Sequence, residues 1–218
     1  VDINARKDTF LAWSVSIPST GKKIFEKPEE LSKEEENIKT LQKKIRGNHE
    51  TDNQLNSAQR KGLRKKWDKA HKRQEALIDK EVCRILNEYK DTYGEFNLGI
   101  DTVAAGASLG TFGQDKVIKS CIKWCKKNNM AHWLVPTPNT SRRCSECGNV
   151  SKTARKLNQY VCKCGHVQHA DENAAENIKE FAEAMMNNGF RMIGTLNRQY
   201  KINSMVFLNK FFNLKGGQ

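Results

Sequence analysis

The 218-residue sequence has no apolar run that approaches the roughly 20 residues needed to span a bilayer, and no signal-peptide pattern near Val1. It is also poor in acidic residues, because 25 Asp and Glu stand against 38 Lys and Arg, for a formal net charge of +13. Such an excess of positive charge favours a polyanionic partner such as nucleic acid. We therefore expect a polyanionic partner and no membrane.

The sequence also lacks the phosphate-binding motif of P-loop proteins. A glycine-rich segment, GASLGTFGQ (106–114), is not followed by GK[ST]. Internal repeats and low-complexity tracts are absent as well. We therefore expect this segment to be a flexible connection, and we look for the chemistry elsewhere.

Cysteine occurs in an odd number, seven, which fits a reducing intracellular compartment better than a disulfide framework. Cys144 and Cys147 form a CxxC motif, Cys162 and Cys164 form a CxC motif, and a glycine follows each. Thiolates at this spacing can chelate one tetrahedral Zn²⁺, and the glycine lets the backbone turn through positive φ. Four protein ligands leave no open coordination position, so the expected zinc is structural.

Two alternatives concern the ligands of this site. Because the second cysteine pair is one residue short, His166 or His169 could replace one sulfur. Cys121 and Cys125, at positions i and i+4, could hold a second metal. We expect them instead to be ordinary residues of a helix, and Cys83 to be equally inert.

The order of the expected elements is typical of an α/β fold around one mixed sheet. Three short strands lie within residues 1–25, with a turn at 18–21, and later strands are expected at 95–101 and 130–136. These assignments rest on apolar residues that alternate along each segment. Because the segments are far apart in sequence, the sheet would combine strands from separate parts of the chain.

Helices are expected where apolar residues recur at helical spacing, over 32–46, 57–89, 114–128 and 171–186. Ser32 and Glu35 have the spacing of a capping box at the start of the first helix, and Gly47 and Asn48 close it. The apolar segment SMVFLNKFFNL (204–214) has no assigned role.

The helix expected at 57–89 carries a dense basic group near its start. Only Asp68 opposes these side chains, and their density suggests contacts to phosphates. A solvated helix face is an equally open interpretation. The basic residues are Arg60, Lys61, Arg64, Lys65, Lys66, Lys69, Lys72 and Arg73.

Three carboxylates indicate a function only when they are considered together. Asp2 lies in an apolar strand, Asp101 ends the strand at 95–101, and Asp171 begins a helix. Singly, Asp101 and Asp171 fit a polar strand end and a helix N-terminal acid favoured by the macrodipole. Together, acids from three elements can hold two Mg²⁺ ions roughly 4 Å apart, as a two-metal phosphodiesterase requires.

The order of these motifs resembles the RuvC-like nuclease half of TnpB-type transposon proteins and type V CRISPR effectors. The similarity covers residues 1 to about 180, and its most specific part is the cysteine module followed by ADENAAENI (170–178). The resemblance implies an RNase H-like fold with an inserted zinc ribbon and RNA-guided cleavage of DNA. It implies that Asp2, Asp101 and Asp171 bind two catalytic Mg²⁺ ions, and that the four cysteines bind one structural Zn²⁺.

The resemblance also implies a division of the chain and its partners. Residues 1–136 would be the first part of the RuvC core, 137–169 an inserted zinc ribbon that binds target nucleic acid, and 170–218 the final core helix and tail. Guide RNA and target DNA would be the partners, in the cytoplasm at the nucleoid. Because the sequence starts at Val1, with Asp2 already in a strand, we expect upstream domains of a longer protein.

Three departures from the family pattern leave a second hypothesis open. The chain has Asp101 where the family usually has Glu, Asn4 where it usually has glycine, and a shortened second cysteine pair. Asp is one methylene shorter than Glu, and Mg²⁺ demands near-ideal geometry. The alternative is a nuclease-inactive protein that binds guide and target and acts by occupancy. A transposase-type recombinase ranks third, because those enzymes typically close their triad with Glu.

Overall fold

The computed structural model describes residues 2–3, 11–13, 23–46, 55–102, 114–136, 139–190 and 198–212. Four features named from the sequence lie outside them: Asn4, the turn at 18–21, the helix end at Gly47 and Asn48, and the loop at 106–113. Among the helices that are described, none is both long and apolar enough to cross a membrane.

The first five strands form two hydrogen-bonded groups. β1 (Asp2–Ile3), β2 (Leu11–Trp13) and β3 (Lys23–Phe25) are antiparallel in that order, and β4 (Leu98–Thr102) pairs in parallel with β5 (His132–Pro136). β1 also contacts β4. The expected single mixed sheet is therefore seen only in part, because no ladder joins β1 to β4 among the described residues.

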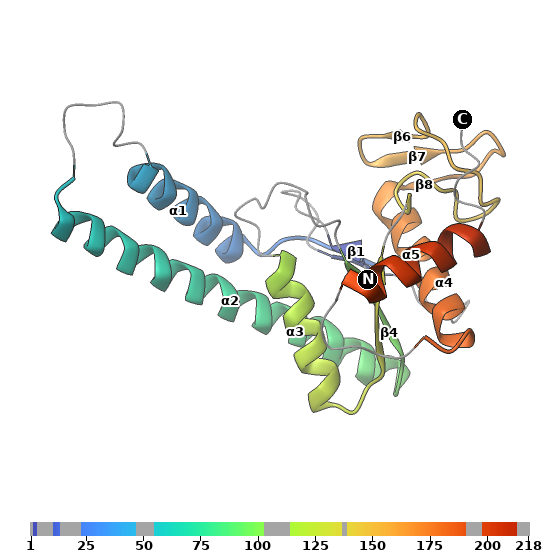
Figure 1. Cartoon of the computed structure of the whole chain (residues 1–218), viewed down its shortest axis with the longest axis horizontal. Coiled ribbons are helices and arrows are strands. Elements are labelled where there is room, and N and C mark those ends of the chain that lie inside the picture. Colours follow the sequence, from blue (N-terminus) through green and yellow to red (C-terminus); the bar gives the residue numbers. More distant parts are fainter. Residues whose placement is uncertain are drawn as a thin grey trace.

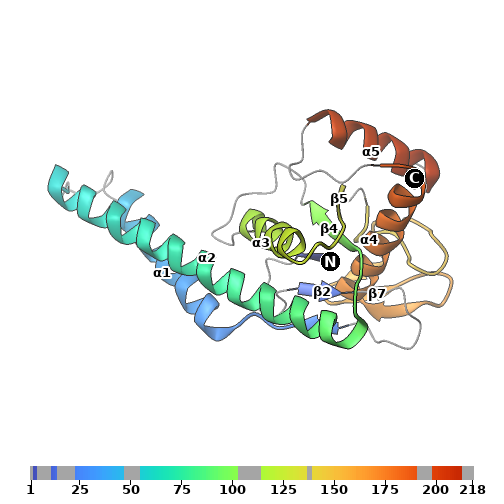
Figure 2. The ribbon, with the colours of Figure 1, turned by 90° about the horizontal axis from the view of Figure 1, so that it is seen from below.

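Two helices form an arm that projects away from the strands. α1 (Glu29–Arg46) and α2 (Ser57–Tyr93) lie side by side as an antiparallel hairpin (Figures 1 and 2). At 1.5 Å per residue, α2 is about 55 Å long. Asn56 starts it with a capping box, since its side chain accepts from Gln59 N and the Gln59 side chain accepts from Asn56 N, both at 2.9 Å.

The prediction of a capping box at Ser32 and Glu35 is wrong. α1 begins one turn earlier, where the carbonyl of Pro28 accepts a hydrogen bond from Ser32 N (3.1 Å). Glu35 lies in the helix interior and accepts a hydrogen bond from Lys27 Nζ at 3.1 Å. Its carboxylate binds a lysine that precedes the helix, so it does not cap a backbone N–H.

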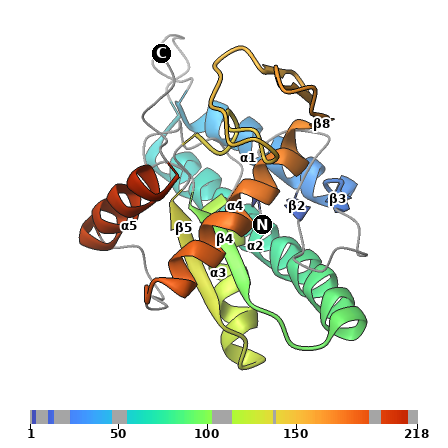
Figure 3. The ribbon, with the colours of Figure 1, turned by 90° about the vertical axis from the view of Figure 1, so that its right-hand side faces the viewer.

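The residues of β4 alternate between two faces, as the strand pattern predicts. Ile100 lies in a core with α2 and α3 (Gln114–Lys127), whereas Gly99 faces α4 (Ala170–Asn187). Figure 3 shows α4 crossing β4 and β5. Asp101 is two residues beyond Gly99 and therefore shares the face that α4 covers.

Small side chains let α4 approach the strand closely. A Cβ atom placed on Gly99 would lie 2.6 Å from Ala182 Cβ, a distance at which the two elements would have to move apart. Ala174 and Ala175, near the start of α4, are buried as well. Glycine at position 99 therefore lets α4 lie close against β4 at Ile178 and Ala182.

The apolar segment at 204–214 belongs largely to a helix that the sequence did not assign. α5 (Arg198–Phe211) contacts α4 and β5, and its Leu208 is fully buried with Trp133 and Phe181. Trp133 also donates its ring N–H to the carbonyl of Phe190 at 2.9 Å. This helix thus adds to the core on the α4 side of β5.

Candidate functional site

The two cysteine motifs bring four sulfur atoms together in a small ribbon. The ribbon strands are β6 (Arg155–Lys156), β7 (Gln159–Val161) and β8 (Val167–His169), and the four Sγ atoms all lie within 4.8 Å of one another. Cys144 Sγ is 3.8 Å from Cys164 Sγ, and Cys147 Sγ is 3.6 Å from Cys162 Sγ. With Zn–S bonds of about 2.3 Å, tetrahedral sulfurs lie about 3.8 Å apart. The cluster can therefore hold one zinc ion.

The backbone around the sulfurs has the turns that a metal knuckle requires. Gly148 N donates to Cys144 O at 3.0 Å and Gly165 N donates to Cys162 O at 3.1 Å. Both glycines have positive φ, 74° and 93°, which other residues rarely adopt. Burial raises the pKa of the Cys144 thiol to about 12, and the backbone N–H of Asn149 lowers the pKa of Cys147 to about 7.

The structure favours four sulfur ligands over a histidine substitute. His166 Nε2 is 2.9 Å from Gln168 Oε1, and His169 accepts a hydrogen bond from Asp171 N as the N-cap of α4. Cys121 and Cys125 lie in the core between α2 and α3, where burial raises the pKa of each thiol to about 12. Among the described residues, only the four clustered cysteines group as metal ligands.

Two asparagines fasten the ribbon to α4. Asn173 and Asn177, one helical turn apart and fully buried, each donate a side-chain N–H to the carbonyl of Arg143 at 2.8 Å. Asn173 also accepts a hydrogen bond from Ser145 N at 3.0 Å. These contacts run to the knuckle residues on both sides of Cys144. They explain physically why the cysteine module and the asparagines of 170–178 occur together.

Arg143 adds a second connection between the knuckle and the helices. Its guanidinium is buried, forms an ion pair with Glu180, and lies 5.7 Å and 4.9 Å from the ring centroids of Phe181 and Phe212. A cation beside two aromatic rings is favoured by both of them. These contacts hold the knuckle against α4 and against Phe212, the residue that follows α5.

Asp171 is more buried than Asp101, the other of these acids whose side chain the structure describes. It is 0% exposed in the first turn of α4, and Arg155 of β6 donates to its Oδ1 at 2.7 Å. Among the described residues, its Oδ2 has no hydrogen-bond partner. A buried carboxylate oxygen is costly without a partner, so Oδ2 fits a site that a cation completes.

The other two acids lie on elements that α4 touches. Asp101 is 6% exposed, pairs with Val135 in the β4–β5 register, and faces α4. Asp2 pairs with Ala12 in the β1–β2 register. α4 contacts both β1 and β4, and β1 contacts β4. The structure thus brings together the three elements that carry the acids.

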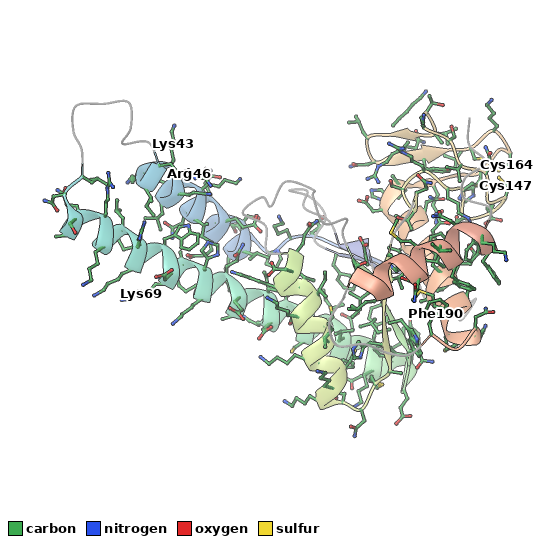
Figure 4. The ribbon with its side chains drawn as sticks, viewed as in Figure 1. Lys43, Arg46, Lys69, Cys147, Cys164 and Phe190 are labelled. Atoms are coloured by element: carbon green, nitrogen blue, oxygen red, sulfur yellow. The ribbon has the colours of Figure 1, made fainter. Side chains whose placement is uncertain are left out.

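The basic residues of α2 lie together on the arm, and all eight are exposed. Residues 57–73 contain eight basic residues and one acid, whereas 74–93 contain three basic residues and five acids. Arg73 makes a two-pronged ion pair with Glu34 of α1, at 3.0 and 3.2 Å. The other seven make no ion pair or hydrogen bond with described residues. Figure 4 places Lys69 on the arm, as well as Lys43 and Arg46 of α1, far from Cys147 and Cys164.

Reversing three of these charges should reduce the salt dependence of nucleic-acid binding. For Lys65, Lys66 and Lys69 changed together to Glu, we expect the slope of log K against log salt to fall by about 2–3, because each phosphate contact contributes roughly 0.7–0.9. Titrations of a labelled oligonucleotide at several salt concentrations measure the slope.

The matched control reverses three exposed lysines outside the basic half of α2: Lys80, Lys126 and Lys127. The control variant changes the net charge by the same amount as the first variant. It should therefore lower the affinity for the oligonucleotide only through the long-range electrostatic field of the protein. Equal slopes for both variants would make the 60–73 group an ordinary solvated helix face.

Comparison with known proteins identifies the relatives of this chain. Residues 117–178 match the family model of the Cas12f1-like TNB domain, a span that contains the four cysteines and Asp171. This match supports the resemblance to TnpB and type V CRISPR effectors that the sequence motifs indicated. No curated protein matches its sequence.

Solved structures of type V effectors share its fold. The chain is similar to the cryo-EM structure of a Cas12f1–sgRNA–target DNA complex, with a TM-score of 0.51, 17% identity, and coverage of 74% of this chain and 44% of that one. It is also similar to a CRISPR-Cas12f ternary complex, with a TM-score of 0.59, 16% identity, and coverage of 81% and 37%. The chain thus spans less than half the length of either effector.

Sequence reasoning missed several residues of this site. Arg155, Arg143 and Asn177 were not singled out, although each makes a contact that positions the ribbon or Asp171. The repeat of asparagine at 173 and 177 was a usable signal, because a buried helix face carries polar side chains only where they are bonded. The two arginines gave no such signal.

Proposed function

We propose that the chain is the RuvC-like, Mg²⁺-dependent endonuclease domain of an RNA-guided DNA-targeting protein. The observation that carries the proposal is the contact of α4 with both β1 and β4, which gathers the elements bearing Asp2, Asp101 and Asp171. Two of these acids are buried. Buried acids on elements that contact one another fit a metal site better than a solvated surface.

An RNase H-like core is part of the proposal. With β1 beside β4, the strands follow the order β3-β2-β1-β4-β5, a mixed sheet with α4 on one face and α2 and α3 on the other. In this arrangement residues 1–136 and 170–218 form the core, and 137–169 form the inserted ribbon. The insertion joins β5 to α4, so it ends two residues before Asp171.

The acids suit magnesium by ligand type. Asp2, Asp101 and Asp171 would hold the two ions, which supply an activated water and stabilise the leaving oxygen of the phosphodiester. The Oδ2 atom of Asp171 is available for this among the described contacts, while Arg155 holds Oδ1 and fixes the carboxylate orientation. Gly99 lets α4 pack closely on β4, the strand that carries Asp101.

Zinc and nucleic acid complete the proposal. Zinc on the four cysteines would be structural, because no ligand position is left for chemistry. Guide RNA and target DNA are the proposed partners, supported by the basic arm and by the contents of the Cas12f1 complex with similar fold. The full effector would include domains beyond this chain.

A second candidate is a nuclease-inactive protein that binds guide and target. Two observations favour it: Arg155 already neutralises one oxygen of Asp171, and Asp101 is one methylene shorter than Glu. Both the Arg155 contact and the shorter side chain at position 101 would weaken the binding of Mg²⁺, which requires near-ideal geometry.

Cleavage of labelled single-stranded DNA separates the two candidates. We expect the guide-loaded full-length protein to cut in Mg²⁺ or Mn²⁺, and Asp2→Ala to abolish cutting, because it removes a metal-binding carboxylate. Guide-dependent binding should remain in both proteins. Binding without cutting in either metal would establish the occupancy candidate.

A further inference from the structure

Leu157 is a leucine in an unfavourable position on the ribbon. It is 86% exposed and has a φ of 52°. Lys156 pairs with Gln159, so Leu157 and Asn158 form a two-residue hairpin loop. Only the first of these two residues has positive φ, as in a type II′ turn, whose first position strongly favours glycine. An exposed leucine here satisfies neither the turn nor the core.

The loop lies against the start of α4. Asn158 O accepts a hydrogen bond from Ala170 N at 2.7 Å, and the residue after Ala170 is Asp171. Arg155 Nε donates to Leu157 O at 3.4 Å while Nη2 of the same guanidinium binds Asp171. One side chain therefore fixes both the loop and the acid, and Leu157 stands at the rim of the proposed nuclease site.

The surroundings of the loop are positively charged. The ribbon and its knuckles, residues 139–169, contain six basic residues and a single acid, Glu146. Lys152 and Lys156 are exposed close to the loop in sequence. An apolar side chain among exposed cations matches a nucleic acid strand, which offers base faces and phosphates together.

We infer that Leu157 contacts the bases of a single strand at the rim of the Asp171 site, while Lys156 holds its backbone. This inference rests on the proposed nuclease function and adds to it a residue that positions the strand by its bases. Leucine replaces the glycine that the turn prefers because glycine has no side chain to place against a base.

Leu157→Gly tests the inference in the zinc-loaded 218-residue chain. The probes are a labelled thymidine oligonucleotide of about 12 nucleotides and an abasic oligonucleotide of the same length. We expect the wild type to prefer the base-bearing strand, and Leu157→Gly to lose that preference by roughly fivefold or more, as the loss of one apolar contact predicts. The thermal midpoint should be retained, because relief of the positive φ offsets the flexibility of glycine.

Three further variants make the test specific. Leu157→Met keeps an apolar side chain and should keep the preference. Lys156→Gln should weaken the binding of both oligonucleotides equally. Val167→Thr removes another exposed apolar side chain of the ribbon and should change the affinity for neither oligonucleotide.

The outcomes separate this inference from the proposed function. A preference retained in Leu157→Gly, or lost equally in Val167→Thr, overturns the role of Leu157 and leaves the nuclease proposal intact. A wild-type chain that binds both oligonucleotides equally, or binds neither, also overturns the inference, and the cleavage assay decides the nuclease proposal separately.

Discussion

Replacement of Asp171 by asparagine is expected to lower DNA cleavage by the guide-loaded protein at least about 10³-fold, with little change in stability. Asparagine has the shape of aspartate, and its carbonyl oxygen can still accept the hydrogen bond that Arg155 donates at 2.7 Å. It removes the negative charge that a magnesium ion requires. Single-turnover cleavage of labelled DNA and a thermal melt measure the two effects.

Glu172→Gln is the matched control for this prediction. Glu172 is the next residue in the same first turn of α4 and is only half-buried, so the substitution removes the same charge at nearly the same place. It should leave cleavage within about twofold, because surface charges contribute little. Equal losses in the two variants would mean that only the charge at the helix N-terminus matters.

Arg155→Ala, in contrast, is expected to lower stability as well as cleavage. It leaves Asp171 fully buried with neither oxygen bonded to an arginine, and breaking a buried pair by removing one partner costs up to about 3–5 kcal/mol. Arg155 itself is 22% exposed, so the loss should fall below that range. Asp171→Asn thus affects catalysis more than folding, and Arg155→Ala affects both.

The parts of the site that the sequence predicted depend on local spacing. Cys144 and Cys147, and Cys162 and Cys164, are close in sequence and must be close in space, so the metal cluster could be predicted. The end of β4 and the start of α4 were predicted because apolar periodicity defines both elements.

The remaining contacts of the site depend on the tertiary fold. Arg155 is sixteen positions from Asp171, and Arg143 is thirty-seven from Glu180. No periodicity links such residues, because a long side chain can reach many partners once its backbone is placed. The start of α1 was missed for a related reason: the Ser32–Glu35 spacing fits a capping box, but Lys27 takes the Glu35 carboxylate.

Removal of zinc is expected to unfold the ribbon and, through it, to disable the acid site. The apolar core of the ribbon is small, comprising Cys144, Ala154, Tyr160, Cys162 and Ala170. A structural zinc ion contributes about 10–16 kcal/mol to the folding of small zinc-finger peptides, far more than such a core can supply. Chelation should therefore raise hydrogen exchange across 139–169, while the amides of α2 and α3 stay protected.

The exposed ligand Cys147 provides the cleanest variant for this prediction. Cys147→Ser disturbs no buried packing, yet it should reduce the zinc content from about one ion per chain and raise exchange as chelation does. Cys83→Ser, a partly buried cysteine outside the cluster, should retain the metal. Because Asn173, Asn177 and Arg155 join the ribbon to α4, cleavage should fall together with the zinc content. Unchanged protection at 139–169 in the metal-free chain would show instead that the hydrogen bonds to α4 hold the ribbon without zinc.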